Sequence, residues 1–244
     1  MGEGIDTVLQ SWKHKPGAIQ ARLATGADGR EVIQMRVDLG ILQLEVSGRP
    51  DGARPRGCLT YFDYLKGKAR RAQRHGRSFT LDEAQCQEAD REFVQYYHRR
   101  LAWLALQQFG RAVDDADHTL AFMDFVRDHS PSDEFTHAHE QYRGFVTFQR
   151  TQASAALAVE KGDPERAIDE IRTGLGSLRS FFAAYGLEDQ LDDNGMVQQL
   201  KTMENSLRQT HGIEATLQEQ LDRAVANEQY EEAARLRDAL KSRH

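Results

Sequence analysis

Apolar residues at helical spacing occupy almost the whole chain from residue 80 to the C-terminus. They recur at steps of three and four residues, and short turns rich in Gly, Pro, Ser and Asp, such as 130–133 and 161–164, separate one run from the next. A helix with one apolar stripe must bury that stripe against a neighbour. The pattern therefore predicts a body of packed helical hairpins.

The same spacing predicts the bounds of individual helices. Thr80 and Glu83 fit a capping box, with Thr80 as the cap of the helix that follows. Residues 135–159 keep helical spacing throughout, so we expect one long helix there. Whether Gly212 separates two helices or lies within one stays open, since a glycine in a helix costs only about 1 kcal/mol.

The helical region contains an internal repeat. Ala167 follows Ala112 at the same separation along the chain as Leu175 follows Leu120, and a tight turn precedes each pair. A small residue followed by an aliphatic one eight positions later resembles the tetratricopeptide pattern, although true repeats adjoin and recur about every 34 residues. We expect a tetratricopeptide-like body that presents a concave binding surface.

Residues 18–46 have the pattern of β structure. Apolar residues alternate with polar ones, and turns at 27–29 and 38–40 divide the stretch into three strands. The simplest arrangement is an antiparallel β-meander, which needs helices packed on one face to be stable.

The expected fold class is thus α+β, predominantly α. We divide the chain into a small β-rich module, a helical-hairpin body, a connecting helix and a terminal helical hairpin, over residues 1–57, 58–187, 188–212 and 213–244.

The terminal hairpin has one apolar stripe on each helix, with a polar break at 227–229 between them. Paired alanines allow the two backbones to approach closely. A hairpin this short needs a second layer to bury its stripes, so we expect it to dock on a partner. The expected contact residues are Leu217, Leu221, Ala224, Val225, Glu228, Tyr230, Ala233, Ala234, Leu236, Arg237, Asp238 and Leu240.

This segment resembles the UVR motif, the interaction hairpin found at the end of UvrB, inside UvrC, in Clp ATPases and in the activator of a protein-arginine kinase. The resemblance rests on Leu221-x-x-Ala224-Val225-x-x-Glu228-x-Tyr230-Glu231-x-Ala233-Ala234-x-Leu236-Arg237-Asp238. It implies a bacterial protein that docks partners of the UvrB/UvrC or Clp/arginine-kinase kind. The whole architecture also resembles bacterial UVR-motif proteins with a similar helical body.

The sequence departs from that motif at Gln229, where Asp is usual. Asp would cap the second helix, and glutamine caps poorly, which lowers the stability of the isolated hairpin by up to about 1 kcal/mol. We therefore expect the hairpin to become firmer when it docks.

One basic segment lies within an acidic protein of net charge −6. Residues 49–77 hold nine basic and two acidic side chains. Its aromatic and basic residues suggest nucleic-acid binding, and the Gly- and Pro-rich run 48–57 suggests an anion loop. The competing interpretations are a solvated helix that pairs with acidic residues elsewhere, and a simple linker. The candidate contacts are Arg49, Arg54, Arg56, Lys68, Arg70, Arg71 and Arg74.

We find no catalytic constellation in the sequence. It has no nucleophile elbow, nucleotide loop or dinucleotide fingerprint. His137 and His139 would point about 200° apart on one helix, which disfavours a shared metal. The acidic residues Asp114, Asp115 and Asp117 are explained by solvation and the dipole of a helix N-terminus. We expect a non-enzymatic protein with no catalytic residues, no cofactor and no metal.

The remaining composition points to a cytoplasmic protein. Cys58 and Cys86 are too far apart for a zinc knuckle, so free thiols are expected. No apolar run approaches the ~20 residues that span a membrane, and the first residues lack a signal peptide.

The leading hypothesis is an adaptor that binds a protein partner through the terminal hairpin. A second hypothesis is a nucleic-acid-binding accessory factor of DNA repair that uses residues 49–77. A third, an enzyme of unrecognised type, has no constellation of residues to support it. For the hairpin itself a further alternative is homodimerisation, in which two copies form a four-helix bundle.

Overall fold

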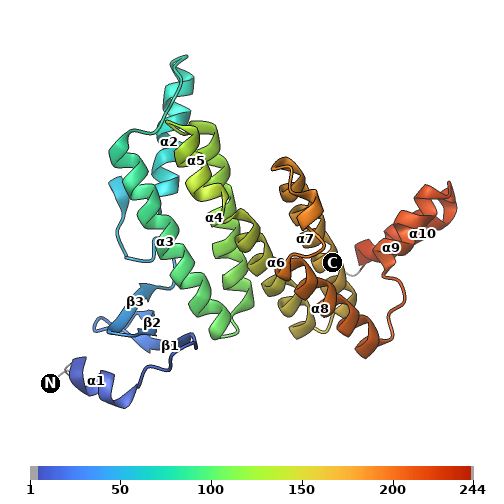
Figure 1. The fold of residues 1–244 in the computed structure, drawn as a ribbon, viewed down its shortest axis with the longest axis horizontal. Coiled ribbons are helices and arrows are strands. Elements are labelled where there is room, and N and C mark those ends of the chain that lie inside the picture. The colour runs from blue at the N-terminus through green and yellow to red at the C-terminus, as the bar shows by residue number, and fades with distance from the viewer. Residues whose placement is uncertain (1–4, 243–244) are drawn as a thin grey trace. The chain divides into compact units, whose positions relative to one another are not determined.

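The computed structural model describes residues 5–242 and shows a mainly helical chain with one small sheet near its N-terminus (Figure 1). The predicted α+β class is confirmed. The chain has two compact units, Met1–Arg143 and Gly144–His244.

The sheet of the first unit is the predicted antiparallel meander, in the order β1-β2-β3. The central strand pairs on both sides, so Ile33 lies opposite Leu23 on one neighbour and Leu44 on the other. Val32 and Ile33 are fully buried, and α3 packs against β1 and β2. The elements are α1 (Ile5–Ser11), β1 (Gln20–Thr25), β2 (Glu31–Val37) and β3 (Gly40–Glu45).

The helices of the first unit enclose an aromatic core. Phe62 and Phe93 both stack on Phe122, with ring centroids 4.8 and 4.6 Å away, and Leu65 and Val126 pack beside them. The elements are η1 (Pro55–Gly57), α2 (Tyr61–Arg74), α3 (Glu83–Ala105), α4 (Phe109–His129) and α5 (Asp133–Glu140).

Two predicted helix bounds are wrong. The capping box of α3 is formed by Asp82 and Gln85, two positions later than predicted, because Leu81 is buried in the core and lies before the cap. The expected helix over 135–159 is two helices, since α5 ends at Glu140 and α6 begins at Arg143.

The core of the second unit lies between α6, α7 and α8. At the crossing of α6 and α7, Gly174 packs so closely on Thr151 that a Cβ at this glycine would overlap the threonine side chain. The helix α8 contributes Val197 and Leu200 to this core, so it is more than a connector. The elements are α6 (Arg143–Glu160), α7 (Pro164–Ala184), η2 (Glu188–Gln190), α8 (Gly195–His211), α9 (Leu217–Ala226) and α10 (Tyr230–Ser242).

Three helical hairpins share one type of turn. In α3–α4, α6–α7 and α9–α10, three residues connect the helices, and the middle one, Gln107, Gly162 or Glu228, has positive φ. In each turn the next residue donates its N–H to a carbonyl five positions back, which is the Schellman arrangement. Gly162 follows Gln107 at the same separation as Ala167 follows Ala112, so the first two turns have the spacing of the sequence repeat.

Gly212, left open by the sequence, ends α8 in the left-handed region at φ 64°. Its neighbour Ile213 donates to the carbonyl of Arg208, which completes another Schellman turn. The α9–α10 hairpin is therefore separated from α8 by a defined turn.

Candidate functional site

The α9–α10 hairpin is held at its base by a buried threonine. Thr216 is fully buried, caps α9 by accepting from the Glu219 N–H, and donates 2.7 Å to Asp169 Oδ1 on α7. Leu217 N donates to Glu165 Oε2, also on α7, at 3.2 Å. Burial raises the pKa of Asp169, although the Thr216 hydrogen bond opposes this.

A small ion-pair network reinforces this base. Arg208 of α8 reaches Glu204 and Glu219 with Nη2–oxygen distances of 2.7 and 2.8 Å, and Arg172 of α7 lies 3.4 Å from Glu219. Burial raises the pKa of Glu219, but hydrogen bonds from Arg208 and Thr216 outweigh it and leave that pKa below its ordinary value. The first turn of α9 is therefore fixed by polar contacts on two other helices.

The inner face of the hairpin is its own small core. Ala224 of α9 faces Ala233 and Leu236 of α10, and all three are buried. Leu217 and Leu221 pack against them. Small side chains at the contact let the two helices approach closely.

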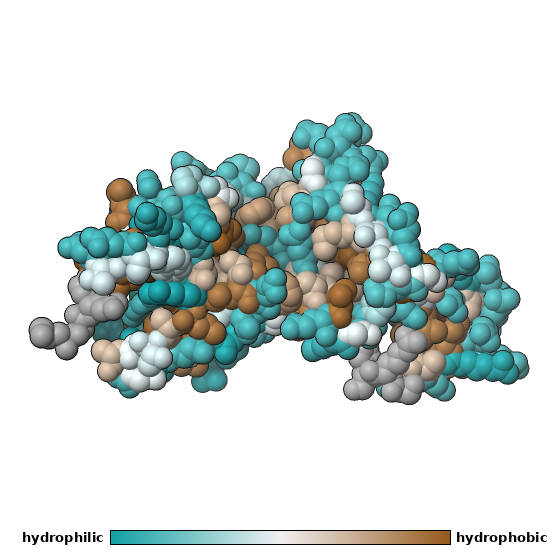
Figure 2. Space-filling model, turned by 90° about the horizontal axis from the view of Figure 1, so that it is seen from below, coloured by the Kyte–Doolittle hydropathy of each residue, from teal (hydrophilic) through white to brown (hydrophobic). Residues whose placement is uncertain are grey.

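The outer face of the hairpin carries an apolar groove of about 700 Å³. Val225 is 54% exposed and Tyr230 is 69% exposed, which is unusual for large apolar side chains that lie together. Figure 2 shows hydrophobic residues of this hairpin, in brown, among hydrophilic ones. The groove is lined by Leu221, Asp222, Val225, Ala226, Tyr230, Ala233, Ala234 and Arg237.

The predicted contact residues thus divide between two faces. Ala224, Ala233 and Leu236 are mainly structural, because they are buried between α9 and α10. Glu228 has a backbone role, since its positive φ forms the turn. The predicted contacts that remain accessible are Leu217, Leu221, Val225, Glu228, Tyr230, Ala234, Arg237, Asp238 and Leu240.

The turn itself leaves α10 without a side-chain cap. Within residues 5–242, the Gln229 side chain makes no hydrogen bond, and only its backbone carbonyl accepts, from Ala233. Acidic side chains surround this end, where Glu228, Glu231 and Glu232 line a shallow depression beside Tyr230.

Comparison with protein families matches residues 215–242 to the UvrB/uvrC motif. These residues are the cap of α9, both helices and the turn between them. The chain carries a UVR motif. No curated protein and no solved structure matched the chain. The UVR motif itself is related to protein interaction and DNA repair.

The basic segment lies far from the UVR motif in sequence, and the structure separates Arg49 from its other cations. Arg49 is only 4% exposed, and its guanidinium donates to Glu88 Oε2 at 2.9 Å and lies 3.3 Å from Asp51. It is occupied within the fold, so we leave it out of any anion-binding surface. Lys68 is half-buried, and the remaining candidates are exposed, namely Arg54, Arg56, Arg70, Arg71 and Arg74.

A buried polar cluster beneath that segment is structural. Arg99 pairs with Asp115 and donates to the carbonyls of Glu45 and Gly48, which ties the end of the sheet to α3 and α4. Explaining Asp115 by solvation was wrong, because it is 4% exposed and ion-paired. Sequence reasoning missed its partner, since nothing in the local pattern marks Arg99.

A second buried group positions α2. Glu92, fully buried on α3, accepts from the first two N–H groups of α2, those of Tyr61 and Phe62, at 2.6 and 3.1 Å. His118 lies 3.1 Å from the same carboxylate and stacks on Tyr96. The start of α2 is therefore anchored in the core.

The histidines near the end of α4 and in α5 make separate contacts. His139 contacts Asp90 at 2.9 Å, while His129 contacts the Phe79 carbonyl. Across the described residues, no three His, Cys, Asp or Glu side chains are placed to hold a metal ion. Cys86 is buried, which raises the pKa of its thiol, and both cysteines are free. None of the helices in the described part of the chain is long and apolar enough to cross a membrane.

Proposed function

We propose that this protein is an adaptor that docks a protein partner through the outer face of its UVR hairpin, and that it carries out no chemical step itself. The observation that carries the proposal is the exposed pair Val225 and Tyr230 over an apolar groove, on a hairpin whose base is fixed to α7 and α8. We call Leu221, Val225, Tyr230, Ala234 and Arg237 the docking face.

The docking face suits a helical partner. Groove-binding helices insert a row of apolar side chains, and a tyrosine with one apolar body and one polar tip is a frequent source of binding energy. The neighbouring depression adds selectivity, because Glu228, Glu231 and Glu232 outnumber Arg235 there and favour a partner with basic residues beside its apolar row.

The resemblance supports the finer parts of the proposal. UVR hairpins in UvrB, UvrC, Clp ATPases and the arginine-kinase activator suggest a bacterial, cytoplasmic protein with a partner from one of those systems. The matching turns of α3–α4 and α6–α7, which have the spacing of the sequence repeat, support a tetratricopeptide-like body.

Partner capture with two matched variants tests the proposal. Val225→Asp places a charge in the groove, whereas Gln220→Asp places the same charge on an exposed position of α9 outside it. We expect the full chain and Gln220→Asp to retain the same partner, and Val225→Asp to lose it by at least about tenfold in affinity, which is about 1.4 kcal/mol. Equal retention by all three would refute the docking face.

The same variants address self-association. If the partner is a second copy, the mass of the full chain in solution will be that of a dimer, and Val225→Asp will return it to a monomer. If the protein is a monomer at all concentrations, the four-helix dimer is excluded, and the docking face must bind a different protein.

A further inference from the structure

Seven cations of the basic segment 49–77 have no carboxylate partner among the described residues. Of the nine basic residues over 49–77, Arg49 pairs with Glu88 and Lys66 pairs with Asp63. In the described chain, no carboxylate pairs with the remaining seven, which are Arg54, Arg56, Lys68, Arg70, Arg71, Arg74 and Arg77.

Most other arginines of the same unit have a carboxylate partner, although Arg22 donates to Gln34 and Arg36 to backbone carbonyls. Arg30, Arg91, Arg99, Arg111 and Arg143 all pair with carboxylates. Residues 78–143 hold thirteen acidic and six basic side chains, so carboxylates are abundant nearby. The unpaired cations therefore reflect placement away from the acidic surface rather than a shortage of acids.

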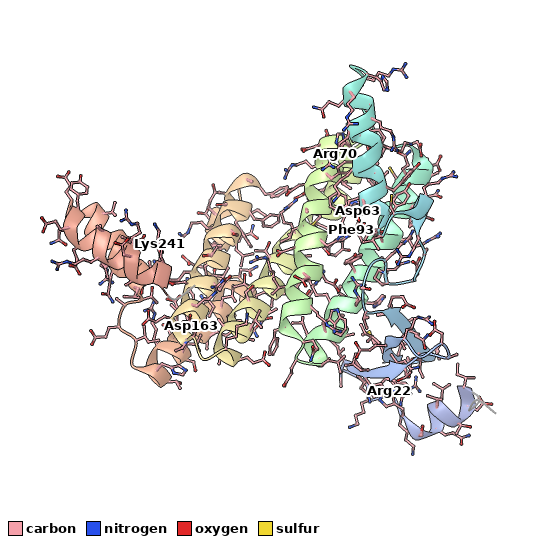
Figure 3. The ribbon with its side chains drawn as sticks, turned by 180° about the vertical axis from the view of Figure 1, so that it is seen from behind. Arg22, Asp63, Arg70, Phe93, Asp163 and Lys241 are labelled. Atoms are coloured by element: carbon pink, nitrogen blue, oxygen red, sulfur yellow. The ribbon has the colours of Figure 1, made fainter. Side chains whose placement is uncertain are left out.

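The placement follows from how α2 is anchored. All buried residues of α2 lie in its first half, at Tyr61, Phe62 and Leu65, where Glu92 holds the helix start. The second half has no buried residue. It extends past the neighbouring helices (Figure 1), and Arg70 lies on α2 (Figure 3). We call residues 66–77 the basic arm.

Cations on the basic arm form a row. Lys66, Arg70 and Arg74 are four residues apart, so they share one side of the helix at intervals of about 6 Å. Arg71 lies at the edge of this row, next to Arg74, whereas Lys68 lies on the opposite side of the helix. Gly76, at φ 65°, follows the helix and precedes Arg77. Such a row can follow a chain of negative charges.

An aromatic groove lies beside the row. A pocket of about 530 Å³ is lined by Lys66, Arg70 and Arg77 and by the rings of Phe79, Phe125 and His129. Both phenylalanine rings are half-buried, with centroids 6.2 Å apart, and Lys68 Nζ lies 5.6 Å from the Phe79 ring. Asp128 is the acidic side chain in this lining.

The combination of cations and half-buried aromatic rings favours a nucleic acid over an acidic peptide as the ligand. An acidic peptide needs only the charges, whereas a single-stranded nucleic acid also offers bases that stack on aromatic side chains. Arginine, the main cation here, binds phosphate through two hydrogen bonds at once. The acidic surface over 78–143 would repel a polyanion and confine it to the arm.

We propose that the basic arm and the Phe79–Phe125 groove bind single-stranded nucleic acid, with the arginines on the phosphates and a base on the aromatic rings. This surface belongs to the first unit and is distinct from the UVR docking face. The protein then joins a nucleic-acid strand to a protein partner.

Fluorescence anisotropy with a labelled, mixed-sequence DNA strand of about 16 nucleotides tests this on the full chain. We expect binding at low salt that weakens as salt rises. The triple variant Arg70→Glu, Arg71→Glu, Arg74→Glu should lose at least about tenfold in affinity. If residual binding is measurable, the slope of log affinity against log salt concentration should become less steep by about two, because three phosphate contacts are removed.

A matched control makes the same change in charge elsewhere. Arg179→Glu, Arg223→Glu and Arg235→Glu together alter exposed arginines of the second unit outside the docking face and should leave oligonucleotide binding within about twofold. An equal loss in both triple variants would mean that net charge alone is responsible, which would overturn the site. So would the absence of binding at low salt.

Three further measurements keep the outcomes distinct. Phe125→Leu should weaken binding of the oligonucleotide but not binding of heparin, because heparin offers negative charge without bases. Equal loss of affinity for both ligands would overturn the stacking role. A poly-glutamate peptide that competes as well as unlabelled DNA would assign the surface to acidic proteins instead. Val225→Asp should leave DNA binding unchanged, so the failure of one proposal is separable from the failure of the other.

Discussion

Arg99 and Asp115 form a buried ion pair with two parallel hydrogen bonds, from Nη2 to Oδ1 at 2.6 Å and from Nε to Oδ2 at 2.9 Å. Both side chains are almost completely buried. The pair joins α3 to α4, and the same guanidinium reaches the carbonyls that end the sheet.

Removal of one partner should leave an uncompensated charge inside the first unit. We expect Asp115→Asn to lower the free energy of unfolding by about 3 to 5 kcal/mol, as found when buried pairs are broken. Asp114→Asn, one residue earlier and less buried, should change it by no more than about 0.5 kcal/mol. Urea unfolding of both variants checks this, and similar midpoints would show that the pair is dispensable.

Two glycines of α7 should respond in opposite directions to alanine. At Gly174 the new Cβ would overlap the Thr151 side chain and lie 2.7 Å from its Cβ, so we expect a loss of about 1 to 3 kcal/mol. At Gly176 nothing lies within 4 Å, so alanine should add about 0.5 to 1 kcal/mol through helix propensity.

Rescue separates a steric effect from a backbone one. Combining Gly174→Ala with Thr151→Ala removes the overlapping Oγ1 and Cγ2 atoms and should recover part of the lost stability. Thermal unfolding of the single and double variants measures this. A double variant that is as unstable as the sum of the singles would argue against the clash.

The UVR turn should be improvable at Glu228. A non-glycine residue in the left-handed region costs about 1 to 2 kcal/mol, so Glu228→Gly should increase the protection of hairpin amides from exchange. Glu231→Gly, in the first turn of α10, should decrease it, because glycine weakens a helix. Reduced protection in Glu228→Gly would mean that the side chain has a role beyond the turn.

Gln229→Asp should supply the missing cap of α10. We expect hairpin stability to rise by about 1 kcal/mol, since aspartate accepts hydrogen bonds from the first free N–H groups of a helix. The gain in amide protection should be largest in the first turn of α10. An equal change in amide protection across α9 and α10 would mean that the added charge at the turn, and not a cap of α10, causes the effect.

Acid should loosen the base of the hairpin through Glu219. Its folded pKa lies below its ordinary value of 4.5, so the folded state binds fewer protons and gains stability from ionisation. This stabilisation is complete above the ordinary pKa and is lost as the pH falls through the lower folded pKa. Glu219→Gln should remove this dependence in hairpin amide exchange, whereas Glu214→Gln should retain it.

Features that depend on neighbours in sequence could be predicted. The helices, the meander and the hairpins follow from periodicity and turn residues, and the internal repeat related Ala112 to Ala167, both of which are fully buried. The UVR motif was recognisable for the same reason, because its two helices and turn are adjacent in the chain.

Features that depend on contacts across the fold could not. Thr80 and Asp82 both offer plausible caps, and only the burial of Leu81 decides between them. Arg49 and Arg70 look alike in a basic segment, yet one faces carboxylates of α3 and the other faces solvent. Likewise, spacing alone does not show that Ala224 faces inward and Val225 outward.

The three-residue turn of the UVR hairpin also fixes a phase relation. Each residue of an α-helix advances by about 100°, so one residue added to or removed from 227–229 would rotate the sequence of α10 relative to α9. Tyr230 would leave the groove and Ala233 would no longer face Ala224. The turn can therefore change its side chains far more readily than its length.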